Sequence, residues 1–165
     1  MSNQLPPSRA LTEYGNYDNH SDFERLFGLH DKQADDAWEL PYTPRDQMID
    51  FHQRKQRFAF LICHRRFGKT VACIGELVIR ALYTTKKNAQ YAYVCPFRSQ
   101  AKAVAWQYLV DMTQGIATDV KVSELSITLP NGAKIWLSGS DNINALRGLY
   151  LDGCVLDEFA QCRPD

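Results

Sequence analysis

The sequence predicts an α/β protein with a mainly parallel sheet flanked by helices. After residue 40, short apolar runs that suit buried strands alternate with segments of helical periodicity. The apolar run RFAFLIC (57–63) leads directly into the loop HRRFGKT, which a helical pattern follows at once. A later apolar run, CVLDE (154–158), ends in two adjacent acids. Alternation of this kind is typical of a sheet whose parallel strands are joined by helical crossovers.

Residues 1–40 differ in composition from the rest. They hold eight acids and three bases, whereas residues 41–165 hold sixteen bases and eleven acids. We expect residues 1–18, which are polar, to be a flexible tail, and Ser21–Leu40 to form an acidic amphipathic helix. The Pro-containing break PYTP then separates this part from one domain over 41–165. The basic excess of that domain suits a polyanionic partner, or is a solvated surface.

Within residues 41–165 each element has its own local signal. Thr43 and Pro44 suit the cap and first position of a helix. Pro96 ends an apolar run, and Asn131–Gly132 favours a hairpin turn. The predicted elements, in chain order, are a helix over 43–55, a strand over 57–63, a helix over 69–83, a strand over 89–96, a helix over 98–112, a hairpin over 120–130 and 133–140, and a strand over 153–159.

The loop has most of a phosphate-binding pattern, G-x-x-x-x-G-K-[ST], but Cys63 stands at its first glycine position. In a strand–loop–helix context, backbone N–H groups and the helix start converge on an anion. Gly68 allows close backbone approach, Lys69 supplies a charge for the phosphates, and Thr70 supplies a hydroxyl for Mg²⁺. The predicted nucleotide-binding residues of this loop are Cys63, His64, Arg65, Arg66, Phe67, Gly68, Lys69 and Thr70.

The adjacent acids complete the predicted site. Asp157 would hold Mg²⁺, and Glu158 would polarise the attacking water. Gln47, 22 residues before Lys69, stands where helicase-like ATPases often place a glutamine beside adenine, or it is an ordinary helix residue. Together these features predict a P-loop NTPase fold (RecA/ASCE-like), incomplete at its C-terminus, that hydrolyses ATP with Mg²⁺.

The ordered motifs of residues 41–165 resemble the large terminase subunit of tailed bacteriophages, the ATPase that packages DNA into capsids. The motifs are TPRDQ, HRRFGKT, YAYVCPFRSQAKAVAW, LSGSDNINALRGLYLDG and CVLDEFAQCRPD. Terminases similarly lack the first glycine and place an arginine in the loop, where Arg65 matches it and Arg66 is a neighbour of unassigned role. The resemblance implies that Arg65 is catalytic through the γ-phosphate, or that it only pairs with a carboxylate.

The resemblance also implies partners and a larger assembly. Arg147 looks like an arginine that relatives insert into a neighbouring subunit's site, which requires a ring, or it orders its own turn. Double-stranded DNA, the portal protein of the procapsid and the small terminase subunit are the implied partners. Because a terminase continues beyond this point into a nuclease domain, we interpret the sequence as a fragment or a truncated reading frame.

Two other classes of protein stay open. One is a helicase-type DNA-dependent ATPase, and the other is a non-catalytic module of the same fold that binds DNA or a capsid protein. Phosphate contacts with DNA are expected from four bases at element ends, Lys86, Lys87, Arg98 and Lys102. No run approaches the roughly 18 apolar residues of a membrane span. The five cysteines form no C-x-x-C pair and four lie in or beside apolar runs, so we expect small buried thiols in a reducing cytoplasm. The terminase resemblance implies the host cytoplasm, with transient docking at the procapsid portal.

Overall fold

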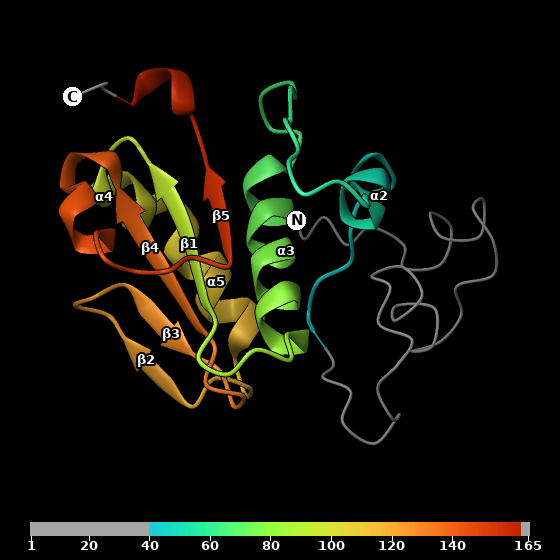
Figure 1. Ribbon diagram of the computed structural model, residues 1–165. Coiled ribbons are helices and arrows are strands. Elements are labelled where there is room, and N and C mark those ends of the chain that lie inside the picture. Colours follow the sequence, from blue (N-terminus) through green and yellow to red (C-terminus); the bar gives the residue numbers. More distant parts are fainter. Residues whose placement is uncertain (1–39, 163–165) are drawn as a thin grey trace, which may run out of the picture. The chain divides into compact units, whose positions relative to one another are not determined.

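A computed structural model describes residues 40–162 of the chain (Figure 1). The expected tail and acidic helix before residue 40 lie outside the described residues. The described residues fall into two compact units, one over 43–62 and one that joins 40–42 to 63–162. We expected one domain over residues 41–165, whereas residues 43–62 form a compact unit separate from residues 63–162.

The first unit contains one helix, α2 (Asp46–Gln53), which buries Met48, Ile49 and His52. It begins later than predicted: Arg45, not Thr43, is the residue before its first turn, and no side chain caps it. Pro44 precedes the helix instead of occupying its first position, so the predicted cap and helix start are each wrong by two residues. Gln47 lies in the first turn of α2.

The predicted strand over 57–63 is wrong, because these residues have no regular secondary structure. Phe58, Phe60 and Ile62 expose 78%, 93% and 99% of their surface. A strand requires a neighbour that accepts and donates its backbone hydrogen bonds, and within residues 40–162 no strand pairs with this run. An apolar run indicates that a segment tends to be buried, but it does not show that a neighbouring strand is available to pair with it.

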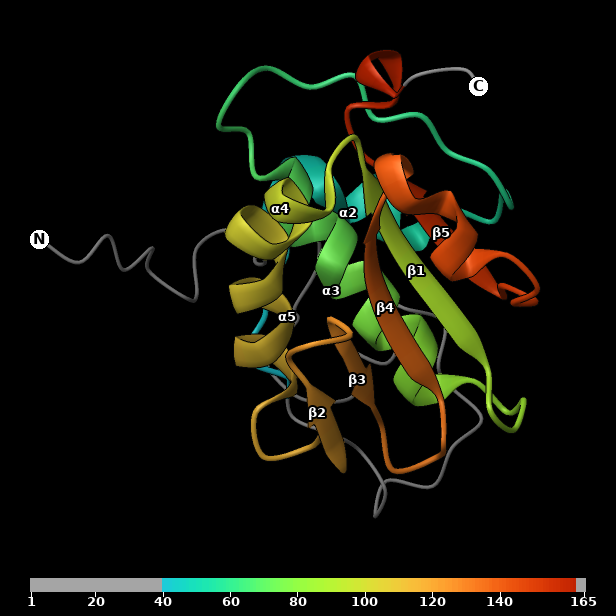
Figure 2. The same cartoon turned by 90° about the vertical axis from the view of Figure 1, so that its left-hand side faces the viewer.

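The second unit is built on a five-stranded mixed sheet in the order β2-β3-β4-β1-β5 (Figure 2). Its strands are β1 (Gln90–Cys95), β2 (Asp119–Lys121), β3 (Ser126–Thr128), β4 (Lys134–Gly139) and β5 (Gly153–Leu156). Strand β1 runs parallel to both β4 and β5, while β2, β3 and β4 are antiparallel neighbours. The α/β class is confirmed. The sheet is mixed rather than mainly parallel, because the predicted hairpin contributes the antiparallel pairs β2–β3 and β3–β4.

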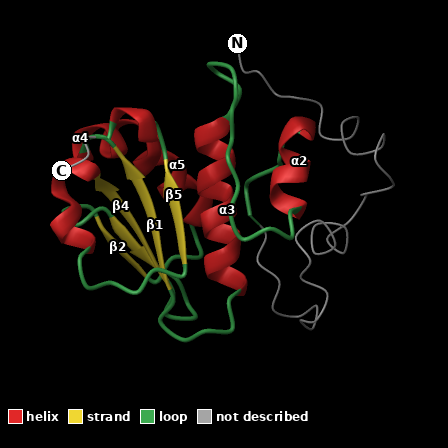
Figure 3. Ribbon diagram, turned by 45° about the horizontal axis from the view of Figure 1, so that its top comes forward, coloured by secondary structure: helices red, strands yellow, loops and turns green. Residues whose placement is uncertain are grey.

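Helices flank this sheet (Figure 3). Helix α3 (Lys69–Tyr83) has the predicted bounds. The predicted helix over 98–112 is observed as a continuous run of α4 (Arg98–Gln100), the π-helix η3 (Ala101–Ala105) and α5 (Trp106–Thr113). Two 3-10 helices, η4 (Ser140–Leu146) and η5 (Phe159–Gln161), follow β4 and β5.

Strand β1 forms the centre of the core because its two faces are both covered. Tyr91 and Tyr93 point toward α3, as the Tyr91 hydroxyl donates to the Arg80 carbonyl oxygen (3.0 Å). Ala92 and Val94 pack on the opposite face against Leu146 of η4. This alternation fixes which side chains of β1 can reach the start of α3. Within the described residues, no helix has both the length and the apolar character that crossing a membrane requires.

Candidate functional site

The loop before α3 has a strained, tightly turned backbone. The Phe67 N–H donates to the His64 carbonyl oxygen (3.3 Å), and both Arg66 (φ 61°) and Gly68 (φ 93°) have left-handed backbones. Helix α3 then begins at Lys69, and its first N–H groups have no acceptor within the helix. The loop therefore ends in a helix start that favours an anion.

The carboxyl end of β5 and the start of α3 lie on the same side of the second unit (Figure 1). Asp157 and Glu158 follow β5 directly and contact Lys69, the first residue of α3. The Asp157 N–H donates to the Val94 carbonyl oxygen (2.8 Å), which extends the pairing of β5 with β1 by one residue. Val155 pairs with Tyr93, so Asp157, two residues later, points to the same face of the sheet as Tyr93. Glu158 follows with a left-handed backbone (φ 50°).

Lys69 contacts both acids. Its Nζ lies 3.2 Å from Oδ1 of Asp157 and 3.5 Å from Oε1 of Glu158. Partial burial works against the charged ammonium group, but the hydrogen bonds and the attraction of Asp157 and Glu158 outweigh it and raise the pKa of Lys69. The structure thus brings together the lysine, the hydroxyl-bearing Thr70 next to it and the two acids that the sequence predicts to form one site.

Tyr93 is a member of this cluster that the sequence analysis missed. Its buried phenol donates to Oδ2 of Asp157, and the Thr70 hydroxyl hydrogen-bonds to the Tyr93 oxygen. Burial and the contact with Asp157 raise the pKa of Tyr93 well above its usual range, and the Thr70 hydrogen bond opposes part of this rise. The available signal was a phenol inside an apolar strand, where burial requires a partner for its hydroxyl.

Cys73 lies one turn into α3 and belongs to the same neighbourhood. Burial, followed by the negative charge of Asp157, raises the pKa of the Cys73 thiol to about 12. This group is therefore a neutral, inert thiol that packs beside the acids. The expectation of buried thiols holds for Cys73 and Cys95, whereas Cys154 is exposed.

The other predicted site residues are less closely placed. His64, Arg65 and Arg66 are exposed on the loop, and Cys63 and Phe67 are partly buried. Arg147 is exposed and directly follows η4, whose Leu146 packs on the sheet face opposite α3. Gln47 belongs to the other compact unit. The roles of Arg65, Arg147 and Gln47 remain predictions.

The four bases expected to share a DNA-facing surface are divided between the two ends of β1. Lys86 and Lys87 precede β1, whereas Arg98 and Lys102 follow it. Lys86 pairs with Asp152 and lies over the Tyr150 ring. Six strand residues span roughly 20 Å, so the two pairs of bases lie about that far apart, and their contact with DNA stays a prediction.

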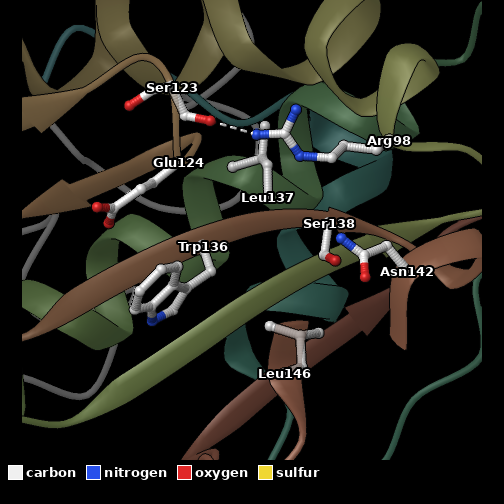
Figure 4. A pocket seen from close by; sticks show the side chains of 8 residues that line it. All are labelled: Arg98, Ser123, Glu124, Trp136, Leu137, Ser138, Asn142 and Leu146. Atoms are coloured by element: carbon white, nitrogen blue, oxygen red, sulfur yellow. Dashed lines mark hydrogen bonds between the residues drawn. The ribbon is translucent and has the colours of Figure 1, made fainter. Parts of the chain in front are cut away.

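Arg98 has a structural role at a pocket that residues of β4 help to line (Figure 4). Its guanidinium donates to the Ser123 carbonyl oxygen (2.5 Å), which links the start of α4 to the turn between β2 and β3. The cavity measures about 410 Å³. Its lining residues are Arg98, Ser123, Glu124, Trp136, Leu137, Ser138, Asn142 and Leu146. None of the predicted nucleotide-binding residues lines it.

The site is suited to a magnesium ion that is held largely by phosphate and water. Asp157 and Thr70 would supply two oxygen ligands to such an ion, and Mg²⁺ commonly takes one or two protein oxygens together with substrate phosphates. Residues 40–162 contain no cluster of three or more His, Cys, Asp or Glu residues that would form an all-protein metal site.

Comparison of the chain with protein-family models, with curated proteins and with solved structures finds no match. The terminase resemblance therefore rests on the ordered sequence motifs, and the site must be judged on its own geometry.

Proposed function

We propose that this protein binds and hydrolyses ATP with Mg²⁺, as the ATPase part of a motor that moves viral double-stranded DNA into a procapsid. The observation that carries the proposal is the meeting of Lys69 with Asp157 and Glu158, from elements almost 90 residues apart in the sequence. A lysine at a helix start beside two strand-end acids is the arrangement that phosphoryl transfer to water requires. The corresponding fold is the P-loop NTPase fold, of the RecA/ASCE-like kind.

Each residue of the cluster has a distinct task in this proposal. Lys69 leaves the acids and binds the β- and γ-phosphates, which compete for its charge with two carboxylates at 3.2 and 3.5 Å. Glu158, whose side chain is 44% exposed, accepts a proton from the attacking water. Asp157 and Thr70 would hold Mg²⁺, which when bound neutralises charge on the phosphates. Arg65, exposed on the loop, supplies a guanidinium to the γ-phosphate.

The packaging role rests on the order of the terminase-like motifs and brings further proposals with it. The partners are double-stranded DNA, the portal protein and the small terminase subunit, and the assembled form is a ring in which Arg147 reaches a neighbouring site. The exposure of Arg147 is compatible with that reach. DNA contact by exposed Lys87 or Lys102 would be sequence-independent and would weaken steeply as salt rises.

The decisive experiment is ATP binding by the Lys69→Ala variant. The wild-type chain should bind ATP in the presence of Mg²⁺, and the variant should lose at least about tenfold in affinity, because one charge-assisted contact to phosphate is removed. Lys87→Ala is the matched control, since Lys87 is an exposed lysine beyond the far end of α3. Unchanged affinity in Lys69→Ala, or an equal loss in Lys87→Ala, would remove the phosphate-loop assignment.

A further inference from the structure

A buried phenol joins the two residues that the proposed function assigns to Mg²⁺. Tyr93 is 2% exposed and lies on β1, whereas Thr70 lies on α3 and Asp157 follows β5. Its hydroxyl donates to Asp157 and accepts from Thr70. A single side chain therefore links the three elements that form the site.

The partners of the Asp157 carboxylate differ in how easily they can be replaced. Oδ1 accepts from Lys69 and from the N–H of Glu158 (3.0 Å), whereas Oδ2 accepts from Tyr93. Lys69 is 29% exposed on a flexible stem and is required at the phosphates. Tyr93 is enclosed by the core and has no such alternative. When Lys69 turns to the phosphates, Oδ1 loses its cationic partner while Oδ2 stays held.

We propose that Tyr93 is a positioning residue for the metal site, a role that rests on the proposed ATPase function. The phenol fixes the orientation of Asp157 through Oδ2, which leaves Oδ1 directed toward the phosphate loop. Its contact with the Thr70 hydroxyl ties the second proposed ligand to the same side chain. Partners of this kind, one contact away from the ligands, commonly set metal affinity.

Tyr91 provides a matched control within the same strand. It is also buried, at 6% exposure, it faces α3 like Tyr93, and its hydroxyl also donates to an oxygen. The acceptor is the Arg80 backbone carbonyl, about three turns away from Lys69 along α3. Tyr91→Phe and Tyr93→Phe each remove one buried hydroxyl and keep the ring, so both should fold and lose similar stability.

The test measures ATP binding to the whole chain as Mg²⁺ is titrated, together with ATP binding in EDTA. In Tyr93→Phe, the Mg²⁺ concentration for half-maximal tightening of ATP should rise by about tenfold or more, the range found when such partners are removed. ATP affinity in EDTA, which depends on Lys69, should stay within about threefold of the wild type. Tyr91→Phe should leave both quantities unchanged.

A double variant distinguishes positioning from general loosening. Once Asp157→Asn has removed the charge that Tyr93 orients, adding Tyr93→Phe should change the Mg²⁺ requirement little further, because contacting residues are not additive. An unchanged Mg²⁺ requirement in Tyr93→Phe, an equal shift in Tyr91→Phe, or fully additive shifts in the double variant would overturn the proposal. In each of those cases Lys69-dependent ATP binding by the wild type would persist. Absence of that binding would instead overturn the proposed function and this role with it.

Discussion

Neutralising the two adjacent acids one at a time should separate chemistry from stability. Glu158 is 44% exposed, and its 3.5 Å contact with Lys69 is an ion pair near solvent. Such pairs contribute about 0–1 kcal/mol, so Glu158→Gln should lower the free energy of unfolding by less than about 1 kcal/mol. Loss of a general base slows turnover by about 10² or more, which corresponds to about 2.7 kcal/mol in the barrier.

Asp157→Asn should lower the free energy of unfolding more than Glu158→Gln does. The carboxylate is 13% exposed and accepts from Lys69, Tyr93 and the Glu158 N–H. An asparagine presents an NH₂ group to one of these donors, and an unmatched polar group at a buried site costs about 1–3 kcal/mol. This variant should therefore be the less stable of the two, and its turnover should demand more Mg²⁺.

The assay combines phosphate release at saturating ATP with urea unfolding of the same samples. Wild-type turnover by Glu158→Gln would refute the general-base role. Equal destabilisation by the two substitutions would refute the assignment of a largely buried, firmly held Asp157 and a more exposed Glu158, because the difference rests on their exposure and partners.

Two further predictions concern the frame around the site. A Cβ at Gly139 would lie 2.1 Å from the Arg98 backbone N and 2.0 Å from Oδ1 of Asp141, so Gly139→Ala should cost at least about 3 kcal/mol in urea unfolding. Gly115→Ala, where nothing lies within 4 Å but φ is +77°, should cost only about 1–2 kcal/mol, and an equal cost would contradict the steric argument. Desolvation opposes ionisation of Asp152, but the contacts with Lys86 and the Gln90 N–H outweigh it and lower the pKa of Asp152 in the folded protein. The ionised carboxylate therefore stabilises the fold above its unfolded-state pKa of 3.8, and this contribution is lost as pH falls through the lower folded-state pKa. Unfolding from about pH 5 to about pH 3 should therefore show a steeper loss of stability for the wild type than for Asp152→Asn, and parallel curves would contradict it.

Helix α3 and the hairpin could be predicted because their signals are local. Gly68 must leave the helical region before α3, and apolar residues then recur at helical spacing from residue 69 to residue 83. The hairpin depends on Asn131–Gly132, where Gly132 has φ +80° and Oδ1 of Asn131 accepts from the Ala133 N–H (3.0 Å). Each of these features is decided by residues within a few positions of each other.

The absence of a strand over 57–63 and the contact between Tyr93 and Asp157 could not be predicted, because both depend on residues distant in the sequence. The apolar run has the composition of a buried strand, but its exposed Phe58 and Phe60 show that composition does not supply a neighbour. Tyr93 meets Asp157 only through the parallel register of β1 with β5, which joins residues 64 positions apart. The order of the motifs in the sequence indicated that the loop and the acids lie at the same edge of the sheet. The register of β1 with β5 decides which side chains of β1 reach them.

The division of roles between the two acids follows from where β5 ends. Successive side chains of a strand point to opposite faces, so a D-E pair continuing the strand would direct only one acid toward Lys69. Asp157 keeps the strand's alternation, through its N–H bond to Val94, and faces Tyr93 and α3. Glu158 breaks it with φ +50°, a conformation that costs a non-glycine residue about 1–2 kcal/mol, and this turn returns its carboxylate to within 3.5 Å of Lys69. The strained backbone therefore brings two neighbouring carboxylates to a single lysine, Asp157 held by several partners and Glu158 more exposed, which is the arrangement that the proposed ligand and base require.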